Sequence, residues 1–159
     1  MSIVNVGIGD YVISSNAGEH VKTYGLGSCV AVVIYDQSMK IAAMMHIALP
    51  ESSVNVKKAE SKPGYFVDTG LPLLLAEVRS RTNGRGSPWV KLAGGSNIMD
   101  EKQRFDIGKR NVLAIKKLLW KYRLGVIAED VGGGISRTVS MSVDTGEVLL
   151  SSGPDQWTI

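Results

Sequence analysis

Thr23-Tyr24-Gly25-Leu26-Gly27-Ser28-Cys29-Val30 leads into the apolar run Ala31-Val32-Val33-Ile34-Tyr35, and this stretch decides how the chain folds. Its apolar and β-branched residues from position 29 to 35 predict a buried strand. Residues 36–40 predict a turn, and residues 41–49, which end at Pro50, predict a second strand. Together the two strands form a predicted antiparallel hairpin.

Weaker patterns surround this hairpin on both sides. Strands are predicted at residues 11–14, 21–24, 89–93, 125–131, 138–143 and 147–151. Helices are predicted at about residues 68–81, capped by Asp68 or Thr69, and at about residues 107–123, with Asp106 at the start. Residues 51–64 are polar without apolar periodicity and predict a mobile surface loop. The chain of 159 residues is expected to form one domain, residues 1–159, of mixed α and β structure.

The composition and charge of the chain indicate which classes of protein it is expected to belong to. The apolar fraction of 44% and the charged fraction of 21% are those of a soluble globular protein. The start of the chain resembles no signal peptide, and no apolar run is long enough to span a bilayer, so we expect a cytoplasmic protein without membrane insertion. A net charge of +3 argues against nucleic-acid binding. One cysteine and two distant histidines provide no metal-binding spacing, so no metal site is predicted.

The lone cysteine, Cys29, has two interpretations. It cannot form an internal disulfide, so it is either a small buried packing residue or a nucleophile. If the hairpin turn is centred between Gln37 and Ser38, Cys29 pairs directly with His46. The imidazole can then take the thiol proton and hold the thiolate in an ion pair. The residues alone leave both interpretations open, because His46 could also be a satisfied histidine at the edge of the core.

Small residues before Cys29 fit the catalytic interpretation. Gly25, Gly27 and Ser28 would let a substrate carbonyl approach the backbone, and N–H groups near Cys29 could stabilise an oxyanion. Thr23, just before the glycine-containing stretch, could orient the imidazole of the histidine.

These residues also carry a family resemblance that extends over nearly the whole chain. The first part of the pattern is Thr23-x-Gly25-Leu26-Gly27-Ser28-Cys29-Val30-Ala31-Val32, followed by Ala43-x-x-His46-x-x-Leu49-Pro50. It continues through Tyr65-x-x-Asp68-Thr69, Gly94-Gly95, Ile107-Gly108-x-Arg110-Asn111-Val112, Ala128-Glu129-Asp130-Val131-Gly132-Gly133, Arg137-Thr138-Val139 and Thr145-Gly146-Glu147. In this order the motifs resemble CheD, the chemoreceptor glutamine deamidase family of bacterial chemotaxis.

The resemblance implies a protein-glutamine glutaminase, an amidohydrolase that needs no cofactor. Cys29 would be the nucleophile, His46 the general base and later the acid, and Thr23 the residue that orients His46. Gly27 and Ser28 would form the substrate and oxyanion region. The implied fold is α+β, with a central two-sheet β layer flanked by helices, similar to the catalytic domain of cytotoxic necrotizing toxins.

The resemblance also implies partners. The substrates would be methyl-accepting chemoreceptors, a CheC-type phosphatase would dock on the same face, and the free protein would be a monomer in the cytoplasm that associates with receptor arrays. Receptor methyl esters would be a second substrate for the same thiolate. The alternative is a binding module that mainly regulates CheC and receptor signalling. Residues 97–105 depart from the family pattern, and Met99 within them is expected to pack rather than to contact a partner.

Overall fold

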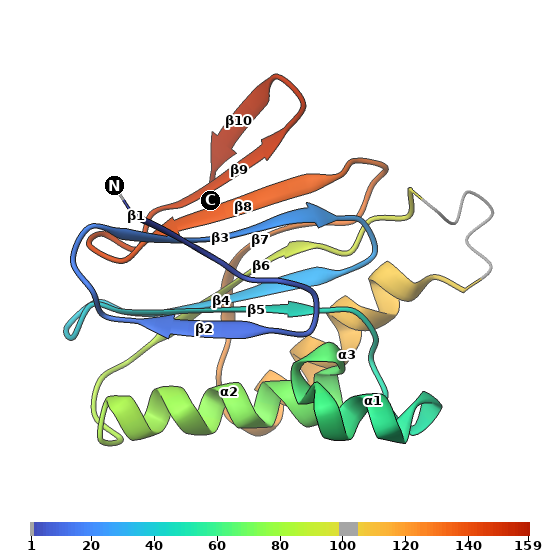
Figure 1. Cartoon of the computed structure of the whole chain (residues 1–159), viewed down its shortest axis with the longest axis horizontal. Coiled ribbons are helices and arrows are strands. Elements are labelled where there is room, and N and C mark those ends of the chain that lie inside the picture. Colours follow the sequence, from blue (N-terminus) through green and yellow to red (C-terminus); the bar gives the residue numbers. More distant parts are fainter. Residues whose placement is uncertain (1, 99–104) are drawn as a thin grey trace.

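The computed structural model describes residues 2–98 and 105–159, and it arranges them as two five-stranded sheets with helices on one side (Figure 1). The strands are β1 (Ser2–Asn5), β2 (Tyr11–Ser14), β3 (Glu19–Leu26), β4 (Val30–Asp36), β5 (Ile41–Ile47), β6 (Trp89–Gly94), β7 (Val126–Val131), β8 (Arg137–Ser142), β9 (Val148–Ser152) and β10 (Asp155–Thr158). The α-helices are α1 (Val56–Ser61), α2 (Val67–Arg81) and α3 (Ile107–Lys121), and the 3-10 helices are η1 (Ser52–Val54) and η2 (Pro63–Tyr65). The α+β class is therefore confirmed.

The predicted hairpin is present as β4 and β5, and every residue of both strands is buried. Its predicted register is wrong by two residues, because His46 pairs with Ala31 and not with Cys29. The closing pair is Asp36 with Ile41, so residues 37–40 form the loop and its centre lies between Ser38 and Met39, not between Gln37 and Ser38. The Asp36 carboxylate stabilises this turn by accepting hydrogen bonds from Ser38 Oγ at 2.7 Å and Met39 N at 2.9 Å.

A shift of two residues keeps Cys29 and His46 on the same face of the hairpin, since side chains alternate along a strand. Cys29 precedes the first paired residue of β4, so it is now a diagonal neighbour of His46 and not a direct one. Diagonal neighbours in an antiparallel pair lie at roughly 7–8 Å, which is still within reach of an imidazole.

The two sheets and the helices form three layers. One sheet has the order β1-β3-β8-β9-β10, and the other has the order β2-β5-β4-β6-β7. Alternate residues of β4 face opposite ways: Ala31, Val33 and Tyr35 pack between the sheets, whereas Val30 and Val32 pack with the residues of α2 and α3.

Figure 1 shows α2 and α3 covering the outer face of the second sheet. Among the described residues no helix covers the other sheet, so the expectation of helices flanking a two-sheet layer holds for one side only. None of the described helices is long and apolar enough to cross a membrane.

Residues 51–64 are not the irregular loop that their polarity predicts. They contain η1 and α1 and lead into η2, and Asn55 Oδ1 caps α1 by accepting a hydrogen bond from Lys58 N at 3.0 Å. α2 starts within two residues of the predicted position, but Asp68 does not cap it, because its carboxylate accepts hydrogen bonds from Ser52. Met99 lies outside the described residues.

The segments that carry Cys29 and His46 lie at one end of the molecule. β3, β5 and β6 all finish there, at the right in Figure 1, and α3 begins there. The hydrogen bonds of the Gly27–Ser28–Cys29 loop link it to the residues just after β6 and to α3. Cys29, at the start of β4, and His46, near the end of β5, therefore both lie at this end.

Candidate active site

Thr23 and His46 form a buried pair between the two sheets. Thr23 comes from β3 and His46 from β5, and Thr23 Oγ1 lies 2.7 Å from His46 Nδ1. The hydroxyl also donates a hydrogen bond of 2.7 Å to the carbonyl oxygen of Val6. Thr23 is 0% exposed and His46 is 1% exposed, so water does not compete for these bonds. The structure thus brings Thr23 into contact with the imidazole of His46, and its orienting role stays a prediction.

This arrangement fixes the tautomer of the imidazole. The threonine hydroxyl has one hydrogen, and the Val6 carbonyl can only accept it. His46 Nδ1 must then be the donor in its bond to Thr23, so Nε2 carries the lone pair. Nε2 is buried and has no hydrogen-bond partner among the described residues. The imidazole is therefore set up as a base at Nε2.

The segment just before β2 holds the backbone of His46. Gly9 N donates to His46 O at 2.8 Å, and His46 N donates to Asp10 O at 3.2 Å. Ile8 and Tyr24, both about half exposed, line a hollow of about 260 Å³ that reaches His46. Sequence patterns gave no signal for this segment, because its contribution comes from backbone groups.

Burial lowers the pKa of His46 to about 4, and the charge of Asp10 opposes this shift. Burial also raises the pKa of the half-buried Cys29 thiol, against a smaller opposite effect of a hydrogen bond from its own backbone. Both groups are therefore neutral near pH 7 in the free protein. This differs from the predicted thiolate–imidazolium pair, and the reason is that neither charge is solvated well enough.

The loop that carries Cys29 is held by its carbonyl groups. Gly27 O accepts from Ser96 N and Cys29 O accepts from Gly95 N, each at 2.8 Å. The turn after β6 approaches so closely that a Cβ at Gly94 would clash with the carbonyl oxygen of Cys29. Gly94 also has a φ of +114°, which L side chains rarely adopt, so glycine is required there.

The peptide geometry of this loop directs its N–H groups the other way. In a trans peptide unit the C=O and the N–H point in opposite directions. Because Gly27 O and Ser28 O point toward Ser96 and α3, the N–H groups of Ser28 and Cys29 point away from them. These two N–H groups are suited to stabilise an oxyanion beside the thiol.

Comparison with known proteins of similar sequence shows the family of the chain. The family model described as CheD chemotactic sensory transduction matches residues 48–152. A probable chemoreceptor glutamine deamidase CheD of Syntrophotalea carbinolica is 53% identical over 162 aligned residues, covering 100% of both chains. The chain belongs to the CheD family. Probable CheD deamidases of Syntrophus aciditrophicus and Anaeromyxobacter dehalogenans are 41% and 42% identical and cover 96% of this chain, and 95% and 96% of their own lengths.

The CheD family model begins after Thr23, Cys29 and His46, whereas the alignment with the Syntrophotalea relative spans them.

Two further features belong to the site region of this CheD-family chain. Ser28 borders a cavity of about 460 Å³ that is also lined by Ser96, by the start of α3 and by Gly132 and Gly133. The glycines after β7 are thus part of a cavity wall.

Asp130, beside those glycines, has a structural partner. Its carboxylate accepts hydrogen bonds of 2.8 Å from Arg137 Nε and from Trp157 Nε1. Arg137 is almost fully buried and also donates to Gly94 O and Gly132 O. It thereby fixes the turn on which Cys29 rests. Sequence reasoning missed Arg137, although a charged residue in an alternating apolar strand was an available signal.

Burial of neutral His46 predicts an acid-dependent loss of stability. Above pH 6.5 the histidine is neutral in both the folded and the unfolded chain, but at lower pH only the unfolded chain gains the proton. Between pH 6.5 and 5, the free energy of unfolding should fall by about 2 kcal/mol through this group. Urea unfolding across this range is expected to show that fall, and His46→Gln should remove it. His20→Gln is the control that should retain it, and an unchanged slope in His46→Gln would contradict a buried neutral His46.

Proposed function

We propose that this chain is a chemoreceptor glutamine deamidase that converts receptor glutamine side chains to glutamate through a thioester on Cys29. The observation that carries the proposal is the Thr23–His46 pair, which leaves Nε2 as a buried base on the face that also bears Cys29. The names of the relatives agree with this reaction. The role of each residue is part of the proposal.

The reaction begins with proton transfer from the Cys29 thiol to His46 Nε2. The sulfur attacks the carbon of the glutamine carboxamide, and the carbonyl oxygen becomes an oxyanion near the N–H groups of Ser28 and Cys29. Substrate binding must first bring the thiol and the imidazole together, since no hydrogen bond joins them in the free protein among the described residues.

In the second half of the reaction, His46 gives up the proton that it took from the thiol, and the thioester is hydrolysed. His46 Nε2–H protonates the amide nitrogen, and the C–N bond breaks. Ammonia departs, and the glutamyl group remains bound to Cys29 as a thioester. A water molecule then gives a proton to His46 and attacks the thioester carbon. The C–S bond breaks, the sulfur takes the proton back, and the product is glutamate. A receptor methyl ester has an equivalent acyl carbon, so methylesterase activity belongs to the same proposal.

Thr23 contributes by holding one orientation of the imidazole, so its hydroxyl can be tested separately from the reacting groups. Thr23→Val removes the hydroxyl but keeps the shape, and kcat for ammonia release is expected to fall about 10- to 100-fold with little change in KM. Thr23→Ser keeps the hydroxyl and is expected to retain most of the activity. Equal activity of the Val and Ser variants would contradict an orienting role for this hydroxyl.

The surface around the site has exposed apolar residues that are suited to contact a protein substrate. Ile8 and Tyr24 at the His46 hollow are 50% and 49% exposed, and Val54 and Val56 on the neighbouring segment are 68% and 59% exposed. Exposed apolar residues of this kind are typical of protein contacts.

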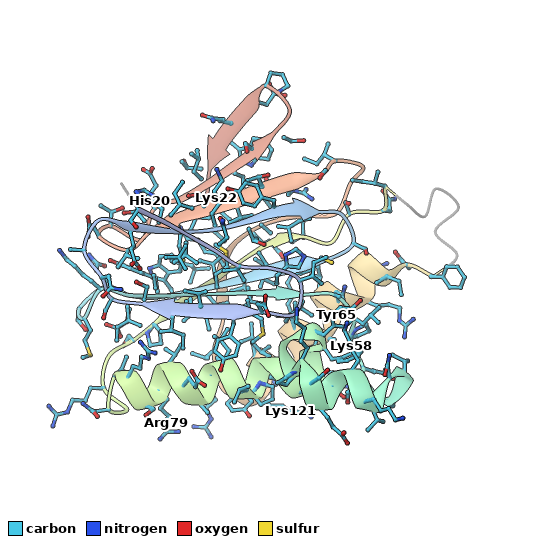
Figure 2. The ribbon with its side chains drawn as sticks, viewed as in Figure 1. His20, Lys22, Lys58, Tyr65, Arg79 and Lys121 are labelled. Carbon is cyan, nitrogen blue, oxygen red and sulfur yellow. The ribbon has the colours of Figure 1, made fainter. Side chains whose placement is uncertain are left out.

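Basic side chains accompany the exposed apolar ones. Lys58 lies over the Tyr65 ring, as Figure 2 shows, and Lys62 contacts Asp10 at 3.4 Å and donates to Ile8 O. Residues 51–64 are thus attached to the segment that holds His46, which supports a part for them in recognising the receptor.

The proposal extends to the cellular setting that the family resemblance implies. The protein would act in the cytoplasm at receptor arrays, would be a monomer when free, and would bind a CheC-type phosphatase through the same end of the molecule. The fold would be similar to the catalytic domain of cytotoxic necrotizing toxins. The family membership supports these statements, and the exposed apolar residues near His46 support the docking of a partner at this end. The test of the activity is conversion of a receptor fragment by the wild type and by Cys29→Ala.

A further inference from the structure

Asn111 connects the two segments that carry the proposed reacting groups. It lies in α3, is 0% exposed, and its Nδ2 donates to Ser28 O and to Ala48 O, each at 3.0 Å. Ser28 immediately precedes Cys29, and Ala48 follows His46 by two residues. One side chain from a third element therefore bonds both sides of the hairpin at its open end.

The hydrogen bonds occur where the strand ladder stops. Val30 and Ile47 are the last paired residues of β4 and β5, and Cys29 lies beyond them. Past that pair, ladder hydrogen bonds no longer set the distance between the chain segments. The Asn111 amide occupies this place, so it is well situated to control how far the thiol lies from the imidazole.

The chemistry of the contact requires an amide. Both partners are backbone carbonyl oxygens, which only accept, and the amide nitrogen offers two N–H donors from one atom. Aspartate has the same shape but no donor, and serine has only one. The two carbonyls also determine which end of the amide is the nitrogen. Asn111 Oδ1 is buried without a hydrogen-bond partner among the described residues, so the bonds of this amide to its surroundings are made through its nitrogen.

We propose that Asn111 is a positioning residue of the deamidase site, which fixes the Cys29 loop relative to His46 through Ser28 and Ala48. The inference rests on the proposed function, because it takes Cys29 and His46 as the reacting pair. It predicts that loss of the amide separates two properties of the thiol. The loosened loop admits water to Cys29, so the thiol ionises more easily and becomes more reactive than in the buried loop. At the same time, the alignment of the thiol with the imidazole that deamidation needs is lost.

The test compares wild type, Asn111→Ala and Asn111→Asp in two assays. The first is ammonia release from a chemoreceptor cytoplasmic fragment, in which kcat is expected to fall about 10- to 100-fold with KM changed less than about twofold. The second is alkylation of Cys29 by iodoacetamide as a function of pH. The variants are expected to react faster than the wild type at pH 7–8, and the midpoint of their rate–pH profile is expected at a lower pH. Thr82→Val is the control, because Thr82 is buried at the far end of α2 and donates one hydrogen bond to Arg79 O.

The control variant is expected to lose stability and to keep both kcat and the alkylation profile. If the Asn111 variants match the wild type in both assays, or only unfold more easily as Thr82→Val does, the inference is overturned. If Asn111→Ala and Asn111→Asp do not fold, Asn111→Ser, which retains one donor, is judged by the same two assays. Wild-type protein that releases no ammonia would refute the proposed function instead, and the alkylation profiles would still decide whether Asn111 controls the environment of Cys29.

Discussion

Cys29→Ala is expected to lower ammonia release from a receptor fragment by at least about 10³-fold, because the variant has no atom that can form the thioester. The fold should survive, since Cys29 is only half-buried and lies outside the strand pairing. A loss of stability below about 2 kcal/mol is expected in urea unfolding.

The matched variant is Cys29→Ser, which retains a hydroxyl of nearly the same size. The serine hydroxyl holds its proton far more strongly than a thiol does, so a neutral base such as His46 cannot activate it well. Cys29→Ser should therefore be nearly as inactive as Cys29→Ala. Ammonia release within tenfold of wild type in either variant would show that Cys29 is not the nucleophile, whereas a wild type that releases no ammonia would leave the chain as a binding module that regulates its partners.

His46→Gln is expected to lower kcat by about 10²- to 10⁴-fold, because the thiol loses the base that takes its proton and the acid that protonates the leaving ammonia. Glutamine can still contact the Thr23 hydroxyl, so the packing between the sheets should change little. His20→Gln on β3 is the matched control, since His20 lies on the other sheet, where Figure 2 labels it, and should keep full activity.

The pH dependence of the wild type gives a second check on His46. A base acts only when it is unprotonated, and the pKa of His46 is lowered to about 4. The value of kcat/KM should therefore stay level as the pH falls through 6.5 and should decline only near pH 4. A decline centred near pH 6.5 would show that His46 is not buried as a neutral base in the working enzyme.

The hairpin shows how far sequence reasoning could reach. The apolar, β-branched runs and the turn residues predict both strands, and the same-face placement of Cys29 and His46 survives because the register error was an even number of residues. The error itself arose from the turn. Asp36 stabilises a four-residue loop through its side chain, and strand periodicity contains no information on that choice.

Other parts of the site could not be predicted because they depend on long-range contacts. Val6 contributes a backbone carbonyl, which leaves no mark in a residue pattern. Asn111 reaches the hairpin from α3, more than sixty residues further along the chain than Ala48. A buried amide on the apolar face of the predicted helix was a signal for Asn111, but only the packed structure shows what it bonds. The two edge strands β1 and β10 also escaped prediction, since both are short and largely exposed.

The most direct test of the account is the mass of a chemoreceptor cytoplasmic fragment after incubation with the protein in water enriched in oxygen-18. The mechanism predicts that wild-type protein converts target glutamines to glutamates that each contain one heavy oxygen from the water that hydrolyses the thioester. Trapping with hydroxylamine should give the hydroxamate at the same glutamines. Cys29→Ala should leave the mass of the fragment unchanged. Equal conversion by wild type and Cys29→Ala, or no conversion by either, would contradict the claim that Cys29 is the nucleophile of a glutamine deamidase.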